Sequence, residues 1–265
     1  MDRLDELANR SIHLIREAYA RHRRMAMLWS IGKDSTTLLW LCRKAFMGRL
    51  PFPVLHIDTS YKFPEIYAFR DEMARQWGLE VVIARNDAAL AAGMSNIRKL
   101  ECCNALKTDA LKAAIDRHGF EALLLGIRRD EHGIRAKERY FSPRDSDFRW
   151  DYKDQPMELW DQYHSEITTG RHYRIHPLLH WTELDVWSLI RREELPVVSL
   201  YFAKNGKRYR SIGCQCCCTP IDSEAATVEA VVDELKKTRL AERAGRAQDK
   251  EDVEVMQKLR ALGYM

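Results

Sequence analysis

The chain has 265 residues, 46% of them hydrophobic, and its 43 basic and 39 acidic side chains give a formal net charge of +4. This length and composition predict one large domain, or one domain with an appendage, around a substantial core. The small net charge excludes binding of polyanions by overall charge, so any basic site must be local. No apolar run is long enough to span a membrane, and the first residues do not resemble a signal peptide, so we expect a cytoplasmic protein without a membrane partner.

The first elements in chain order are a helix, a strand and a second helix. Apolar residues recur at helical spacing from Leu4 to Ala18, and the apolar run Met25–Trp29 predicts a buried strand. The polar residues 30–35, Ser-Ile-Gly-Lys-Asp-Ser, follow this strand, and helical spacing resumes up to Ala45. A strand, a tight polar loop and a helix together direct backbone N–H groups toward an anion.

The loop 30–35 offers several groups that suit a phosphate. Gly32 allows close approach of the backbone, Ser30 and Ser35 offer hydroxyls, and Lys33 offers a mobile positive charge. Asp34 would repel phosphate by itself, so it caps the helix or helps to hold a magnesium ion that bridges phosphates. An ordinary capped turn would use the same residue types, so the loop alone leaves two interpretations open.

Strands and helices then alternate along the chain. Three more strands are predicted at 53–59, 79–84 and 122–127, with helices at 64–77 and 104–118 between them. This alternation predicts an α/β fold in which a parallel sheet has helices on both faces. Ligands of such sheets bind beyond the carboxyl ends of the strands, where the loop 30–35, Asp58 and the end of the fourth strand should lie.

The segment 128–170 keeps no helical or strand period. Its basic residues are interleaved with aromatic ones: Arg128, Arg129, Arg135, Lys137, Arg139, Arg144 and Arg149 alternate with Tyr140, Phe141, Phe148 and Trp150. A loop of this length is usually functional or disordered, and a disordered linker would be poorer in aromatic residues. We therefore predict a basic lid over the phosphate site, with a solvated excursion as the alternative. A capped helix beginning at Thr182 and charged helices at 228–239 and 252–262 follow.

Several separated motifs identify the chain as a member of the ATP pyrophosphatase superfamily. The loop 30–35 resembles its pyrophosphate loop, Ser-x-Gly-x-Asp-Ser, and most of the chain from about residue 10 resembles the small subunit of sulfate adenylyltransferase. The other matching segments are 50–53, 56–59, 128–131, 135–139, 158–160, 181–187 and 263–264. The resemblance implies an adenine nucleotide alpha hydrolase-like, Rossmann-like domain over 1–200, with a cysteine-rich and helical segment over 201–265. It also implies cleavage of ATP between its α- and β-phosphates.

The resemblance further implies roles for individual residues. Pyrophosphate would leave from the loop, the adenosine would lie near Asp58, and basic side chains with a magnesium ion would offset the growing negative charge. The expected catalytic residues are Lys33, Asp34, Arg128, Arg129 and Arg135. The expected ATP-binding residues are Ser30, Ile31, Gly32, Lys33, Asp34, Ser35, Asp58 and Gly126.

The seven cysteines predict metal or redox chemistry, because structural disulfides are rare in cytosolic proteins. The segment 101–107 resembles the adenylylsulfate reductases that hold a 4Fe-4S cluster, and a later Cys-x-x-Cys fits their other two ligands. The implied ligands are Cys102, Cys103, Cys214 and Cys217, with Cys216 or Cys218 as an alternative to Cys217. The other interpretation is that the first two cysteines are buried small hydrophobes and the later ones bind zinc.

Two departures separate the chain from the adenylyltransferase subunit. That subunit carries an additional stretch after the position of Tyr201, of which only 202–207 remain here, and it lacks these cysteines. The reductases, in turn, end in a Glu-Cys-Gly segment whose thiolate attacks sulfur, and no cysteine follows Cys218 here. A reductase is therefore a poor match.

Three functional hypotheses follow. The first is an ATP pyrophosphatase that drives sulfur insertion into nucleic acid, as in DNA phosphorothioation, with a cysteine desulfurase and other sulfur-modification proteins as partners. The second is the catalytic subunit of a sulfate adenylyltransferase that works with a GTPase. The third is a regulatory nucleotide-binding module whose cluster senses redox state. Release of pyrophosphate separates the third from the others, and dependence on sulfate separates the second from the first.

Overall fold

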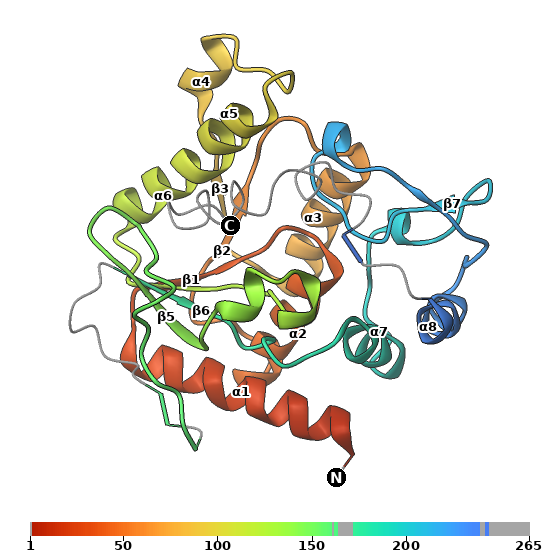
Figure 1. Cartoon of the computed structure of the whole chain (residues 1–265), viewed down its shortest axis with the longest axis horizontal. Helices are drawn as coiled ribbons and strands as arrows, with labels where there is room; N and C mark the ends of the chain where they lie inside the picture. The colour runs from red at the N-terminus through yellow and green to blue at the C-terminus, as the bar shows by residue number, and fades with distance from the viewer. Residues whose placement is uncertain (1, 161, 164–171, 239–241, 244–265) are drawn as a thin grey trace.

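A six-stranded sheet with the strand order β3–β2–β1–β4–β6–β5 forms the centre of the protein, as the computed structural model shows for residues 2–160, 162–163, 172–238 and 242–243 (Figure 1). The strands are β1 (Met25–Leu28), β2 (Val54–Ile57), β3 (Val81–Ala84), β4 (Ala122–Leu124), β5 (Phe141–Arg144) and β6 (His172–Ile175). β5 is antiparallel to β6, and the other neighbouring pairs are parallel. The predicted α/β class with a mainly parallel sheet is confirmed.

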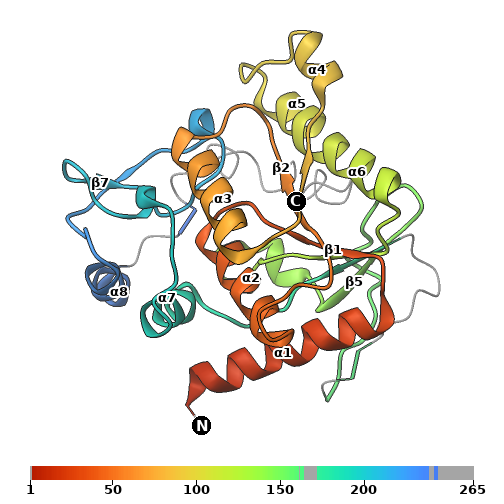
Figure 2. The same ribbon diagram turned by 180° about the vertical axis from the view of Figure 1, so that it is seen from behind.

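Helices cover both faces of the sheet (Figures 1 and 2). These helices are α1 (Arg3–Arg21), α2 (Lys33–Ala45), α3 (Pro64–Trp77) and α6 (Ala110–His118). Beside them, α7 (Glu183–Arg192) packs against α2, and α8 (Val228–Lys237) packs against α7. Side chains alternate along a strand, so Met25 and Met27 pack in the core formed with α1, α2, α3 and α7, whereas Ala26 and Leu28 pack in the core formed with α6. Burial on both faces explains why β1 is a continuous apolar run.

The helical region before β4 is longer than the sequence predicts. The short α4 (Asp87–Ala91) and α5 (Lys99–Cys103) precede a π-helical turn, Asn104–Asp109, which leads into α6. Cys102 and Cys103 therefore lie on a helix and directly before a π-helical turn, a feature that often marks functional sites.

The middle of the predicted lid belongs to the sheet. Phe141–Arg144 forms the edge strand β5, and the buried Arg144 donates a hydrogen bond of 3.0 Å to the buried carboxylate of Glu138. The four aromatic side chains of this segment, Tyr140, Phe141, Phe148 and Trp150, are also buried. These residues stabilise the edge of the sheet rather than covering the phosphate loop. Residues 161 and 164–171 of the predicted lid lie outside the described residues.

The C-terminal part adds to the same fold. The predicted cap of α7 is present, since the Thr182 hydroxyl accepts a hydrogen bond of 3.2 Å from the backbone N–H of Asp185. A small antiparallel pair, β7 (Lys207–Arg208) and β8 (Ile221–Asp222), precedes α8, whose Val231 and Val232 join the larger core. The predicted helix at 252–262 and the motif at 263–264 lie outside the described residues. Among the described helices, none is long and apolar enough to cross a membrane.

Candidate functional site

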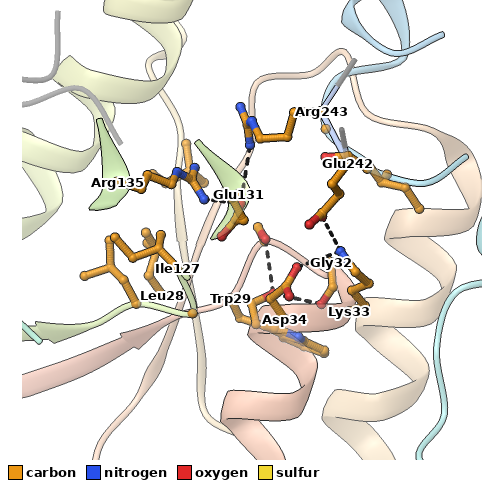
Figure 3. Close-up of a pocket in the computed structure, with 18 of the residues that line it drawn as sticks. Leu28, Trp29, Gly32, Lys33, Asp34, Ile127, Glu131, Arg135, Glu242 and Arg243 are labelled. Carbon is orange, nitrogen blue, oxygen red and sulfur yellow. Dashed lines mark hydrogen bonds and ion pairs between the residues drawn. The ribbon is translucent and has the colours of Figure 1, made fainter. Parts of the chain in front are cut away.

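A pocket lies at the carboxyl ends of β1 and β4 (Figure 3). In the sheet, β2 lies on one side of β1 and β4 lies on the other side. The loops that leave β1 and β4 therefore run in opposite directions from this point. Such a switch point is where parallel α/β sheets bind ligands. The lining combines five residues of the predicted phosphate loop with the end of β4: Ser30, Gly32, Lys33, Asp34, Ser35, Leu125, Gly126 and Ile127. The predicted meeting of these segments is observed.

The phosphate loop has an unusual backbone at Ile31. Its φ angle is 67°, in the left-handed region that a β-branched residue rarely adopts. The side chain is 1% exposed and packs in the larger core, which holds the strained residue in place. The next residue, Gly32, is the N-cap of α2, and the backbone N–H of Lys33 donates a hydrogen bond of 2.8 Å to the Tyr201 hydroxyl. Strain of this kind concentrates at functional sites.

Gly126 permits a close approach between β4 and the start of α2. A Cβ atom at this position would lie 3.0 Å from the backbone C and O of Asp34 and from the backbone N of Ser35. Those atoms belong to the first turn of a helix, which cannot yield as a flexible side chain would. Glycine at 126 therefore fixes the distance between the two halves of the pocket.

Lys33 is buried and surrounded by carboxylates. Its Nζ lies 3.0 Å from Oδ2 of Asp34 and also pairs with Glu242 (Figure 3). The same Nζ lies 4.0 Å from Oε1 of Glu183. The side chain is only 1% exposed. Burial and the nearby charge of Glu242 raise the pKa of Glu183, against the opposing effect of Lys33. Lys33 is thus positioned at the loop by charge pairs rather than left free in solvent.

Arg128 supplies a second buried cation beside Lys33. Its guanidinium pairs with Asp34 and Glu242, and its Nε donates a hydrogen bond of 2.9 Å to Asp130. Burial disfavours the charged form of Arg128, but the charges of Glu242 and its other acidic neighbours outweigh that effect and raise its pKa. The fully buried Arg128 therefore remains a permanent cation behind the loop.

A second charge cluster joins the turn after β4 to the pocket. Glu131 accepts a hydrogen bond of 2.9 Å from the backbone N–H of Arg128 and pairs with Arg135. Nη1 of Arg243 lies 3.6 Å from Oε2 of Glu131, and all three side chains line the pocket (Figure 3). Burial raises the pKa of Glu131, but the charges of Arg135 and Arg128 outweigh this effect and lower it. This cluster therefore adds two basic side chains, Arg135 and Arg243, to the pocket.

Four of the predicted catalytic and ATP-binding residues, Ile31, Asp58, Arg128 and Arg129, are not part of the pocket lining. Arg129 packs beside the Tyr140 ring, with 5.9 Å from its Cζ to the ring centroid, and contacts His180. Asp58 lies directly after β2, where it accepts hydrogen bonds from the backbone N–H of Ser60 at 2.8 Å and from the Tyr67 hydroxyl at 2.7 Å. The catalytic role expected of Arg129 has no geometric support. Asp58 lies at the expected sheet edge but is already held by its neighbours.

The sequence interpretation missed several residues of the pocket. They are Lys62, Lys107, Glu131, Tyr201, Glu242 and Arg243. Glu131 lies within the matching segment 128–131, so that motif could have identified it. Glu242 and Arg243 lie in a stretch of mixed charge that resembles a solvated helix end, and no local pattern distinguishes them.

The cysteine-rich segment lies at the edge of the same pocket. Cys214 forms an isolated β-bridge with Lys62, and its Sγ lies 3.1 Å from the Thr59 hydroxyl. The backbone N–H of Gln215 donates a hydrogen bond of 2.8 Å to the carbonyl of Tyr61, and Lys62 itself lines the pocket. These contacts attach the segment to the loop that follows β2.

The two cysteine groups are within range of electrostatic interaction. Burial raises the pKa of Cys102 to about 11, and the neighbouring thiols of Cys103, Cys214 and Cys216 contribute to this shift. Burial and Cys216 likewise raise the pKa of Cys217 to about 12, and the sulfur atoms of Cys216 and Cys217 are 3.7 Å apart. The donor atoms suit an iron–sulfur cluster, but such thiols must lose their protons to bind metal. Within the described part of the chain, no group of three or more potential ligands is arranged to hold a metal ion. The cluster remains a prediction.

Comparison with known proteins identifies a family model and several relatives that resemble this chain over most of its length. The model of the phosphoadenosine phosphosulfate reductase domain matches residues 24–220. Sulfate adenylyltransferase subunit 2 of Pseudomonas putida is 40% identical over 297 aligned positions, which cover 98% of this chain and 97% of that protein. The same subunit of Azotobacter vinelandii gives the same values. Because the alignments are longer than this chain, the relatives carry additional residues.

Two solved structures share the fold. Phosphoadenylyl-sulfate reductase from Candida auris has a TM-score of 0.56 at 16% identity, covering 81% of this chain and 96% of that chain. Candida glabrata FMN adenylyltransferase in complex with ATP has a TM-score of 0.59 at 17% identity, covering 98% of this chain and 83% of that chain. At such low identity, these likenesses support the expected adenine nucleotide alpha hydrolase-like fold and nothing further.

Proposed function

Because this chain belongs to the phosphoadenosine phosphosulfate reductase domain family, and within it to the family of sulfate adenylyltransferase subunit 2, we propose that it transfers the adenylyl group of ATP to sulfate and releases pyrophosphate. The observation that carries this proposal is 40% identity over nearly the whole length of both proteins. The relatives therefore favour the second of the three hypotheses over sulfur insertion into nucleic acid, although that reaction was the first choice from the sequence.

The proposed reaction needs positioning and charge stabilisation more than covalent help from the protein. A sulfate oxygen attacks the α-phosphorus, the bond to the oxygen that bridges to the β-phosphorus breaks, and pyrophosphate leaves with that electron pair. Lys33 and Arg128 stabilise the charge that develops on the leaving group, because both are buried cations beside the loop. Loop N–H groups at the start of α2 add to this stabilisation.

A magnesium ion is the expected cofactor of this step. Asp34 lines the pocket and offers the carboxylate oxygens that magnesium prefers, so its chemistry fits that role. When bound, the ion would neutralise part of the phosphate charge. The contacts of Asp34 with Lys33 and Arg128 orient its carboxylate before any ion binds.

The acceptor end of the pocket suits a small dianion. Lys62, in the loop after β2, and Lys107, in the π-helical turn, line the pocket. Arg135, in the segment after β4, and Arg243, which pairs with Glu131, line it as well. These cations favour binding of an oxyanion in the pocket. A GTPase subunit is the proposed partner, since the relatives are named as one subunit of a larger enzyme.

The experiment is the reverse reaction, in which ATP forms from adenylylsulfate and pyrophosphate. The purified chain is assayed alone and with a GTPase subunit of sulfate adenylyltransferase. ATP formation that requires adenylylsulfate supports the proposal. Pyrophosphate release from ATP that is independent of sulfate in both preparations would contradict it.

One observation favours a second candidate function. The cysteines at the pocket edge are among the predicted ligands of a 4Fe-4S cluster. Such a cluster suits an enzyme that inserts sulfur into nucleic acid together with a cysteine desulfurase. This candidate predicts that ATP cleavage to AMP and pyrophosphate is stimulated by DNA together with the desulfurase. Stimulation by sulfate instead would exclude it.

A further inference from the structure

The carboxylate of Glu242 lies between the two buried cations of the phosphate site. One of its oxygens pairs with Lys33 and the other with Arg128 (Figure 3 shows the first contact). The side chain is 6% exposed, and Glu242 lines the pocket. A carboxylate therefore already occupies the position where the proposed reaction needs phosphate oxygens.

Glu242 and the neighbouring Arg243 together contact both halves of the pocket. The neighbouring Arg243 approaches Glu131 in the turn after β4, with 3.6 Å between Nη1 and Oε2. Glu242 contacts the loop after β1 through Lys33. The pair Glu242–Arg243 thus adds one negative and one positive charge to a site built from residues far away in the sequence.

We infer that Glu242 is an internal competitor of the polyphosphate: its carboxylate binds Lys33 and Arg128 when the site is empty and must leave them when pyrophosphate or the phosphates of ATP bind. The inference rests on the proposed function, because it assumes that Lys33 and Arg128 contact phosphate. It adds a residue that controls how readily that contact forms.

Charge is the reason for competition rather than joint binding. Asp34 and Glu183 are already near Lys33, so a polyphosphate that joined Glu242 there would place several negative charges around one ammonium group. Departure of Glu242 leaves neither cation unpaired, because Lys33 keeps Asp34, and Arg128 keeps Asp34 and Asp130. Departure of Glu242 therefore removes one negative charge from the site as the polyphosphate enters, and both cations keep an anionic partner throughout.

Competition by Glu242 should measurably lower the affinity of the site for pyrophosphate. When a binding-competent state is only fractionally populated, the apparent dissociation constant rises by the inverse of that fraction. If Glu242 occupies the cations about nine-tenths of the time, its removal should tighten binding of pyrophosphate about tenfold.

The experiment is calorimetric titration of metal-free inorganic pyrophosphate into the full chain. Glu242→Gln removes the charge at nearly constant size, and Glu242→Ala removes the whole carboxylate. The matched control is Glu193→Gln, since Glu193 pairs with Lys44 at 2.6 Å outside the pocket lining. Lys33→Ala reports whether pyrophosphate binds at this site. Circular dichroism of each variant verifies that it is folded.

The expected result is about tenfold tighter binding in both Glu242 variants, no change in Glu193→Gln and loss of binding in Lys33→Ala. Unchanged or weaker binding in the folded Glu242 variants, with binding still lost in Lys33→Ala, would overturn the competitor role alone. Binding in Lys33→Ala equal to that of the unaltered chain would overturn the phosphate site and the competitor role together.

Discussion

Arg128, directly before the turn that follows β4, pairs with Asp34 in the first turn of α2, although the two residues are 94 positions apart in the sequence. The pair joins the two sides of the switch point in the sheet. It also orients the carboxylate that we propose for magnesium and holds a permanent cation behind the phosphate loop. The chemistry of the site therefore depends on a contact between the ends of two different strands.

Replacement of Lys33 by alanine should nearly abolish adenylyl transfer. Loss of one charge contact aimed at a transition state typically lowers the rate about 100-fold or more. Pyrophosphate release measures the effect, and Lys44→Ala is the control, because Lys44 is more exposed and pairs with Glu193. Products should contain AMP or an adenylylated acceptor. ADP as the main product of the unaltered enzyme would refute the assignment of the pyrophosphate loop.

Gly126→Ala should destabilise the protein and lower its activity. The added Cβ would lie 3.0 Å from backbone atoms of Asp34 and Ser35, so the start of α2 would have to move. Overpacking of this kind costs about 1–3 kcal/mol in the free energy of unfolding, measured by denaturant titration. Gly133→Ala is the matched control, since a Cβ atom added at Gly133 would have no neighbour within 4 Å among the described residues. Equal stability of the two variants would contradict the close approach of β4 to α2.

Arg135→Gln and Arg129→Gln should differ although both were expected to be catalytic. Arg135 lines the pocket, so its loss should raise the KM for ATP or the acceptor about tenfold, the effect of one charge-assisted contact. Arg129 packs beside Tyr140 and His180, so its variant should keep a KM within about twofold of the unaltered enzyme. Steady-state kinetics at fixed ionic strength test this difference. A larger KM effect at Arg129 than at Arg135 would assign the two roles the other way round.

The cysteines should bind iron. Protein purified without oxygen should be brown and hold about four irons per chain if the site is full. Cys102→Ser should bleach the colour but leave ATP binding intact, because the phosphate loop does not use this thiol. Cys42→Ser is the control, since Cys42 is buried in α2 within the larger core. Colourless anaerobic protein that holds one zinc ion would rule out the cluster.

The sequence by itself determined the framework of this protein. Buried parallel strands are continuous apolar runs, and the helices between them carry caps and regular apolar spacing, so β1, β2, β4 and most of the helices could be predicted locally. The loop 30–35 was identifiable for the same reason, because its glycine, hydroxyls and charges are adjacent in the chain.

Only the tertiary structure decided which charged side chains meet. Arg128 and Arg129 are neighbours, yet Arg128 is buried against Asp34 and Arg129 packs beside Tyr140. Because this segment has no regular helical or strand period, its sequence does not show where either side chain points. Glu242 reaches Lys33 across 209 positions, and β5 pairs with β6 although its segment looked like a lid. Such contacts depend on long-range packing and charge pairing, which local spacing does not encode.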